Sequence, residues 1–152
     1  MYRLSPRQPE RQQISVNTEA ILLAGVHAWG GCPLERVICR PLMPLANEPL
    51  IGHALSWLRN SGLTQANICA NSDTRALWDV LGNGADLGIE LHYYEDVMPR
   101  GPAGCIRDAV RKSASQTFVV VEGTLVPQLE LAELLSAHRK SEAALTIAVR
   151  DM

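Results

Sequence analysis

Short apolar runs alternate along the chain with segments in which apolar residues recur every three or four positions. The first pattern is typical of strands buried in a sheet, and the second of helices with one apolar face. Strands are predicted at residues 20–24, 67–71, 89–94, 117–122 and 145–149. Helices are predicted at residues 49–61, 73–81, 102–114 and 129–139.

The ends of the first helix follow from local residues. Asn47 is a suitable N-cap, Pro49 suits the first turn, and Gly62 suits the position just after the last turn. We therefore expect Asn47 to cap a helix that begins near Pro49.

The regular alternation of strands and helices predicts an α/β domain. We expect a Rossmann-like open, mainly parallel sheet with helices on both faces. Residues 1–17 are polar and include three arginines and two prolines, so we predict a flexible leader followed by a domain at residues 18–152. The last predicted strand fits the edge of such a domain, and it also fits a longer domain that is cut at Met152.

Composition and charge narrow the class of protein. A chain of 152 residues with 47% apolar and 20% charged residues is typical of one globular domain. A net charge of −2 gives no reason to expect a nucleic-acid or membrane partner. The leader lacks the apolar stretch of a secretory signal, and the four cysteines are scattered rather than paired as in zinc sites. We therefore expect a cytoplasmic protein with reduced cysteines.

Ligands of open α/β sheets bind beyond the carboxyl ends of the strands, so the loops there are the candidate sites. The loop after the first strand contains Gly25, Gly30 and Gly31, whose small size lets backbone N–H groups approach a phosphate. The same loop contains the bulky His27 and Trp29 and no lysine. A surface loop with one aromatic anchor is therefore the alternative reading.

Two further loops carry candidate chemistry. Gly101 and Gly104 begin a predicted helix, where a base or a phosphate could lie close to the backbone, with Arg100 beside it. Ordinary helix capping explains the same residues. Glu122 ends an apolar strand and could bind Mg²⁺ together with substrate phosphates, although a strand-end glutamate can also be merely solvated.

Taken together, these loops resemble the nucleotide-sugar pyrophosphorylase family, the sugar-1-phosphate nucleotidylyltransferases, over about residues 19–150. Leu23-Ala24-Gly25 and Pro33-Leu34 match the family pattern L-A-G-G-x-G-T-R-L-x-P-L-T. Residues 39–51 (CRPLMPLANEPLI) match P-K-P-L-L-P-V-A-N-K-P-L-I, and residues 101–104 (GPAG) match G-T-A-G. Arg40 stands where the family has a phosphate-contacting lysine.

The resemblance implies a fold of the nucleotide-diphospho-sugar transferase type. It also implies that the nucleotide-binding residues are Ala24, Gly25, Arg40, Gly101 and Gly104, with Arg40 as the candidate catalytic residue. The family reaction joins an NTP and a sugar-1-phosphate to an NDP-sugar, releases pyrophosphate and uses Mg²⁺.

Several family positions are changed in this chain. Val26 and Ala28 replace two glycines of the first pattern, and Gly30 replaces its arginine. The strand-end N-G-D, whose aspartate binds Mg²⁺ in the family, reads Glu122-Gly123-Thr124, so Thr124 occupies the aspartate position. Glu122 is then the carboxylate that could bind the metal instead.

Three functions are consistent with a chain that keeps the spacing of the family motifs but has several of their residues replaced. We expect first a catalytically impaired module that binds a nucleotide or an NDP-sugar, or that regulates another protein. The second is an active Mg²⁺-dependent nucleotidylyltransferase, with a rewired site or as part of a longer chain. The third is a structural subunit, in a homo-oligomer or paired with an active paralogue.

Overall fold

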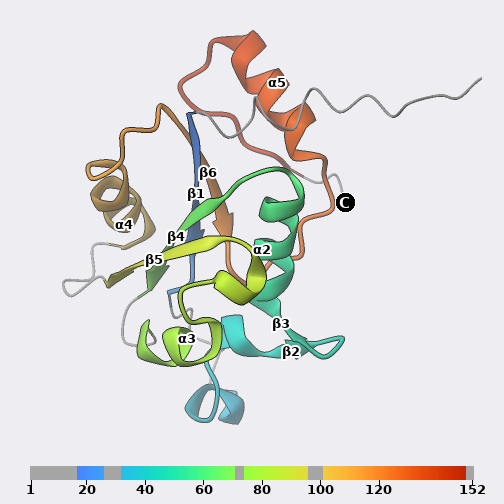
Figure 1. The fold of residues 1–152 in the computed structure, drawn as a ribbon, viewed down its shortest axis with the longest axis vertical. Helices are drawn as coiled ribbons and strands as arrows, with labels where there is room; N and C mark the ends of the chain where they lie inside the picture. Colours follow the sequence, from blue (N-terminus) through green and yellow to red (C-terminus); the bar gives the residue numbers. More distant parts are fainter. Residues whose placement is uncertain (1–16, 26–31, 71–73, 96–100, 150–152) are drawn as a thin grey trace, which may run out of the picture.

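The computed structural model of the protein describes residues 17–25, 32–70, 74–95 and 101–149 (Figure 1). Four strands form the main sheet: β1 (Thr18–Leu23), β4 (Gln65–Ala70), β5 (Glu90–Glu95) and β6 (Thr117–Glu122). The helices are α2 (Leu50–Asn60), α3 (Thr74–Leu81), α4 (Gly101–Val110) and α5 (Leu131–Ser141). Short 3-10 helices are η1 (Pro33–Arg36), η2 (Arg40–Leu42) and η3 (Ala85–Leu87), and β2 (Pro44–Leu45) pairs with β3 (Glu48–Pro49).

The main sheet is parallel throughout and has the strand order β5-β4-β1-β6. β1 is central: Ala20 pairs with Ala66 of β4 on one side and with Val119 of β6 on the other. Side chains of β1 are buried on both faces of the sheet, as parallel sheets require. This is why its sequence is an apolar run rather than an alternation of apolar and polar residues.

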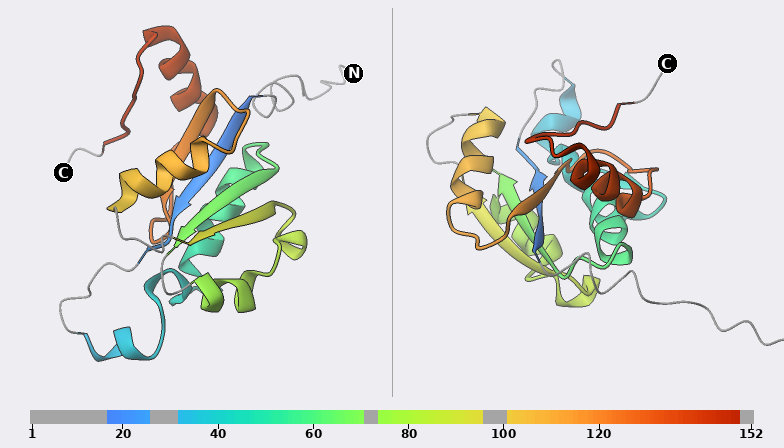
Figure 2. Two further views of the ribbon diagram at one scale, coloured as in Figure 1. Left: turned by 90° about the vertical axis from the view of Figure 1, so that its left-hand side faces the viewer. Right: turned by 90° about the horizontal axis from the view of Figure 1, so that it is seen from above.

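Helices cover both faces of the sheet, as predicted. Leu55 of α2, Leu77 of α3 and Leu131 of α5 share one core with the side chains of Ala20 and Leu22. On the opposite face, a smaller core holds Ala109 of α4 and Ile21 of β1. The view from above shows α4 on one side of the sheet and α2 and α5 on the other (Figure 2, right). None of the described helices combines the length and the apolar composition that a membrane span requires.

The strand predicted at residues 145–149 is wrong. Residues 143–149 have no regular secondary structure, and the side chains of Leu145, Ile147 and Val149 are 73%, 69% and 83% exposed. The Thr146 hydroxyl contacts His138 Nδ1 at the end of α5, 2.9 Å away. The apolar alternation is real, but a strand forms only beside a partner, and no described strand pairs with this segment.

The predicted N-cap at Asn47 is also wrong. Asn47 and Ala46 form the two-residue turn of the β2–β3 hairpin, with φ angles of 70° and 50°. Such turns need positive φ at both central residues, which asparagine tolerates well. The N-cap of α2 is instead Pro49, and the Leu50 N–H donates to the Met43 carbonyl, 2.9 Å away.

Candidate functional site

The carboxyl ends of β1 and β6 lie side by side. Leu23 pairs with Glu122, and the Gly123 N–H donates to the Leu23 carbonyl at 2.9 Å. On the other side of β1, the Ala24 N–H donates to the Cys69 carbonyl at 2.8 Å. The structure therefore brings three predicted site residues, Ala24, Gly25 and Glu122, to the carboxyl ends of two neighbouring strands.

Gly25 and Gly123 differ in the space around them. Among the described residues, no atom lies within 4 Å of a methyl group added at Gly25, so this part of the structure leaves space for a ligand at the end of β1. A methyl group at Gly123 would lie 3.2 Å from the Leu23 carbonyl oxygen and 3.4 Å from Ile51 Cδ1. Gly123 thus lets the turn after β6 lie against β1, a requirement that its sequence position alone did not reveal.

Arg40 begins the 3-10 helix η2, and its side chain is exposed. The next residue, Pro41, is buried and anchors the segment. The Arg40 guanidinium forms no hydrogen bond or ion pair with any residue that the structure describes. The segment lies beyond the strand ends, near the β2–β3 hairpin (Figure 1). An unpaired arginine in this place can meet an anion.

Gly101 is the first residue of α4, and its φ of 71° explains why a glycine is needed there. No atom of the part of the chain that the structure describes lies within 4 Å of a methyl group added at this position. Gly104, one turn later, is buried. Figure 2 (left) shows the start of α4 on the side of the sheet towards which the strand arrows point. The α4 N-terminus is therefore on the same side of the molecule as the ends of β1 and β6.

Glu122 and Thr124 are the oxygen donors at the end of β6, and both side chains are half-buried. Among the described residues, no three His, Cys, Asp or Glu side chains gather to hold a metal ion. One carboxylate and one hydroxyl fit Mg²⁺ when substrate phosphates supply further oxygen ligands. The donors present therefore fit a metal that arrives with a nucleotide better than a resident ion.

Some predicted residues lie outside the described part of the chain. These are the changed positions Val26, Ala28 and Gly30, and the candidate anion ligand Arg100. Most of the predicted leader, residues 1–16, also lies outside it. Asn17 is described, and its carbonyl accepts hydrogen bonds from the N–H groups of Gln116 and Thr117.

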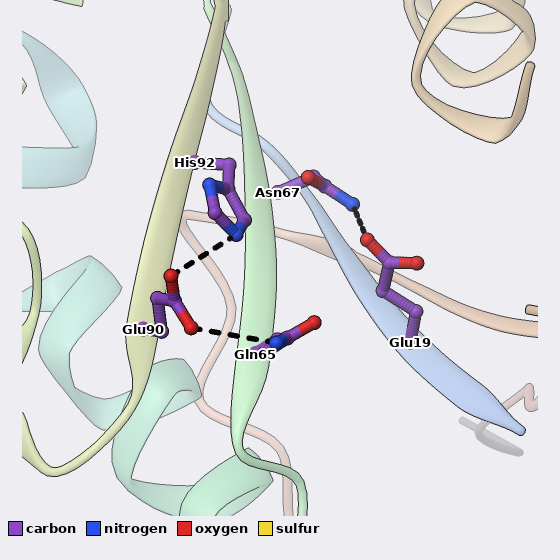
Figure 3. A network of polar contacts seen from close by, with 5 residues as sticks. All are labelled: Glu19, Gln65, Asn67, Glu90 and His92. Atoms are coloured by element: carbon purple, nitrogen blue, oxygen red, sulfur yellow. Dashed lines mark hydrogen bonds and ion pairs between the residues drawn. The ribbon is translucent and has the colours of Figure 1, made fainter. Parts of the chain in front are cut away.

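A buried polar link on the α4 face was not predicted (Figure 3). Asn67 is 1% exposed, and its amide donates to the Glu19 carboxylate, which also accepts from the Ser113 hydroxyl. The pKa of Tyr94, which lies nearby, is raised mainly by the burial of its side chain, and to a lesser extent by electrostatic interactions with Glu19 and Cys69. The sequence signal was Glu19 itself, a charged residue in the apolar run of β1.

The Glu19 link holds strands and the α4–β6 connection together and is remote from the candidate site. Glu19, Gln65 and Glu90 all lie at the amino ends of their strands, opposite the edge formed by Gly25 and Glu122. In the same view, Gln65 Nε2 donates to Glu90 at 3.4 Å and His92 lies 3.6 Å from Glu90 (Figure 3). These contacts are exposed and contribute little to stability.

An open depression of about 310 Å³ lies between β5 and α4. Its lining includes the acids Glu95 and Asp108 and the bases Arg111 and Lys112. Because these opposite charges balance, the depression does not favour the binding of a phosphate. Lys112 Nζ lies 4.9 Å from the centre of the Tyr94 ring, so this ammonium group already makes a cation–π contact. The carboxyl end of β1, at Gly25, is therefore the better candidate for a nucleotide site.

Comparison with known proteins identifies the family and the fold. The family model for nucleotidyl transferases matches residues 19–152. A mannose-1-phosphate guanylyltransferase from Mycobacterium tuberculosis is 28% identical over 130 residues, which cover 85% of this chain and 36% of that protein. A D-glycero-α-D-manno-heptose 1-phosphate guanylyltransferase from Aneurinibacillus thermoaerophilus is 26% identical over 137 residues, covering 88% of this chain and 58% of that protein.

A solved structure shares the fold. A candidate glucose-1-phosphate thymidylyltransferase from Bacillus anthracis, in complex with sucrose, superposes with a TM-score of 0.73 at 20% identity, covering 81% of this chain and 50% of that chain. The chain thus spans 36–58% of the lengths of the two guanylyltransferases and half of this structure. Since the family model matches nearly everything from the start of β1 onward, the chain belongs to the nucleotidyl transferase family.

Proposed function

We propose that this chain binds a nucleotide or an NDP-sugar at the carboxyl edge of its sheet and is catalytically impaired, acting as a binding or regulatory module. The observation that carries the proposal is the open backbone at Gly25, at the end of β1 and beside Glu122 of β6. Phosphates favour such places because N–H groups can approach them without interference from side chains.

The remaining contacts are assigned by chemistry. Arg40 has an exposed, unpaired guanidinium among the described residues and suits a nucleotide phosphate. The small residues Gly101 and Gly104 at the start of α4 suit the base or a second phosphate. Because two relatives are named guanylyltransferases, GTP and GDP-mannose are the first ligands to test.

Catalytic impairment is supported by the changed positions in the sequence. Thr124 offers a neutral hydroxyl where the resemblance implies a metal-binding carboxylate. Gly30 offers no charge where it implies an arginine. Loss of one contact that stabilises developing charge typically costs roughly 10²–10³-fold in rate. A cytoplasmic location belongs to this proposal and rests on the scattered cysteine spacing of the sequence.

The test is calorimetric titration of the chain with GTP, ATP, UTP and GDP-mannose, each with and without Mg²⁺. We expect saturable binding of at least one nucleotide and no release of pyrophosphate on addition of a sugar-1-phosphate. Absence of binding across the whole panel at millimolar ligand would contradict the proposal.

The second candidate function is nucleotidyl transfer itself, and the position of Glu122 favours it. Its carboxylate is at the end of β6, next to the open end of β1, where it could hold Mg²⁺ together with the NTP phosphates. A bound Mg²⁺ would neutralise charge on those phosphates. In the reaction, a phosphate oxygen of the sugar-1-phosphate attacks the α-phosphorus, the bond to the bridging oxygen breaks, and pyrophosphate leaves.

An assay for pyrophosphate release with Mg²⁺ and several sugar-1-phosphates separates the two candidates. Measurable turnover that disappears in Glu122→Gln would establish the transferase and Glu122 as its metal ligand. Turnover that Glu122→Gln leaves unchanged would exclude Glu122 from that role.

A further inference from the structure

The β2–β3 hairpin connects the segment that carries Arg40 to helix α2, and its own pairing is weak. The two pairs of the hairpin are Pro44 with Pro49 and Leu45 with Glu48. Since proline has no N–H group, neither residue of the first pair can donate a hydrogen bond to the other strand. A hairpin of only two strands is at best marginally stable by itself. Contacts with the rest of the protein must therefore fix the position of this hairpin.

His53 supplies such a contact from the first turn of α2. Its Nε2 lies 3.0 Å from the Leu45 carbonyl oxygen. Because a carbonyl oxygen only accepts hydrogen bonds, Nε2 carries the hydrogen and is the donor. Nδ1 of the same ring lies 3.9 Å from Glu48 Oε2. One side chain of α2 therefore meets both strands of the hairpin, which lies at the lower end of this helix in Figure 1.

Two backbone hydrogen bonds extend this connection to Arg40. The Leu50 N–H at the start of α2 donates to the Met43 carbonyl at 2.9 Å. The Met43 N–H in turn donates to the Arg40 carbonyl at 3.1 Å. Buried Pro41 fixes the segment on one side, and the hairpin fixes it on the other. The direction of the exposed Arg40 side chain therefore depends on where the hairpin lies.

We propose that His53 is a positioning residue for the nucleotide site: it holds the β2–β3 hairpin against α2 and thereby orients Arg40 towards the phosphates of the nucleotide. This inference rests on the nucleotide binding proposed above. His53 does not touch the nucleotide and acts only through Arg40. An arginine whose backbone is held in place loses less conformational entropy on binding an anion than one on a loosely held segment.

The first test is calorimetric titration with whichever of GTP, ATP, UTP and GDP-mannose binds the unchanged chain most tightly. His53→Leu removes the hydrogen-bond donor and should raise the Kd roughly two- to tenfold, as expected for the loss of one neutral hydrogen bond. His53→Gln keeps an N–H group that can reach the Leu45 carbonyl and should restore most of the affinity. Trp57→Phe is the matched control and should leave the Kd unchanged, because Trp57 Nε1, one turn later on α2, donates to the Leu129 carbonyl instead, at 2.8 Å.

A double-mutant cycle determines whether His53 acts through Arg40. In the Arg40→Ala background, His53→Leu should cause no further rise in the Kd, because the side chain that His53 positions is already absent. A general disturbance of the fold would instead weaken binding by the same factor in both backgrounds. An equal rise in the Kd with and without the Arg40 side chain would therefore overturn the proposal.

Hydrogen exchange in the absence of nucleotide tests the structural step separately from binding. The amides of Met43 and Leu50 should exchange faster in His53→Leu than in the unchanged chain, and at the unchanged rate in His53→Gln. Equal exchange in all three proteins would show that His53 does not hold this segment. Faster exchange with an unchanged Kd would refute the positioning role and leave the proposed nucleotide binding intact. Absence of nucleotide binding by the unchanged chain would contradict both.

Discussion

Two glycines at the end of the central strands have opposite roles. Gly25 has open space beside it among the described residues, whereas Gly123 allows contact between two backbone segments. Arg40, in η2, could be recognised from sequence because it stands where the resemblance implies a phosphate-contacting lysine. Substitutions of single residues can therefore separate effects on nucleotide binding from effects on the free energy of unfolding.

A pair of matched substitutions makes that separation. Gly25→Ala should leave the free energy of unfolding within about 0.5 kcal/mol of the unchanged protein, because the methyl group meets no atom of the described residues. It should weaken nucleotide binding, because the methyl group occupies the space of the ligand. Gly123→Ala should cost roughly 1–3 kcal/mol through the contacts with Leu23 and Ile51. Urea unfolding and calorimetric titration measure both effects.

Arg40 is expected to contribute a charge-assisted hydrogen bond to a nucleotide phosphate. Arg40→Ala should weaken nucleotide binding by roughly 1.5–3 kcal/mol, which is about ten- to a hundredfold in Kd. Arg40→Lys should restore part of the loss, since a lysine keeps the charge but not the planar guanidinium. Arg139→Ala, an exposed arginine on α5, is the control and should not change the Kd. Equal Kd values for all variants would remove Arg40 from the site.

Tyr93 gives the stability of the protein a defined dependence on alkaline pH. Its hydroxyl donates to the Gly82 carbonyl at 2.7 Å, and burial raises the pKa of Tyr93 to about 12. In the unfolded chain the pKa is near 10, so between these values the unfolded state binds fewer protons than the folded state. The contribution of Tyr93 is fully present below pH 10 and is lost as the pH rises towards 12.

Tyr93→Phe checks this assignment. At pH 9 the variant should be roughly 1 kcal/mol less stable than the unchanged protein because the hydrogen bond is missing. Between pH 10 and pH 12 the difference should shrink, because only the unchanged protein has a phenol to deprotonate at this position. A constant difference across this range in denaturant unfolding would contradict the stated role.

At the scale of elements, four of the five predicted strands and all four predicted helices are present, with ends shifted by a few residues. β6 has the predicted bounds, Thr117–Glu122. Strands of a parallel sheet are buried on both faces, so their apolar runs are visible without knowledge of their neighbours. The hairpin β2–β3 was missed because each of its strands has two residues, too few to form a pattern.

The connection from α3 to β5 depends on Gly84. This residue is buried, has a φ of 81°, and a methyl group there would lie 1.9 Å from the Ile89 carbonyl oxygen. Gly84→Ala should destabilise the protein by at least about 3 kcal/mol, because the backbone must move. Gly82→Ala is the matched control: its φ of 55° is also positive, but no atom of the described segments lies within 4 Å of the added methyl group, so the cost should be about 1 kcal/mol. Thermal unfolding compares the two.

At the scale of the whole molecule, metal and nucleotide are expected to stabilise the fold together. Glu122 is the acid at the end of β6, and the described residues contain no metal-binding cluster. Mg²⁺ alone should therefore leave the melting temperature unchanged, and Mg²⁺ with a nucleotide should raise it above the value with nucleotide alone.

Glu122→Gln should abolish the additional increase from Mg²⁺ and retain the increase from the nucleotide. Chelation of Mg²⁺ by EDTA should have the same effect on the unchanged protein. An increase from Mg²⁺ in the absence of nucleotide would instead indicate a resident metal site.

The sequence by itself determined the class of fold, the positions of the main strands and helices, and the family. These features depend on burial patterns and motif spacing, which are properties of short segments. Only the tertiary structure decided that Asn47 lies in a hairpin turn, and that residues 145–149 pair with none of the described strands. It also decided that Gly123 packs against β1 and that Glu19 meets Asn67 and Ser113. Each of these depends on which segments become neighbours, and a local pattern records the tendency of a segment to pair but not whether a partner lies beside it.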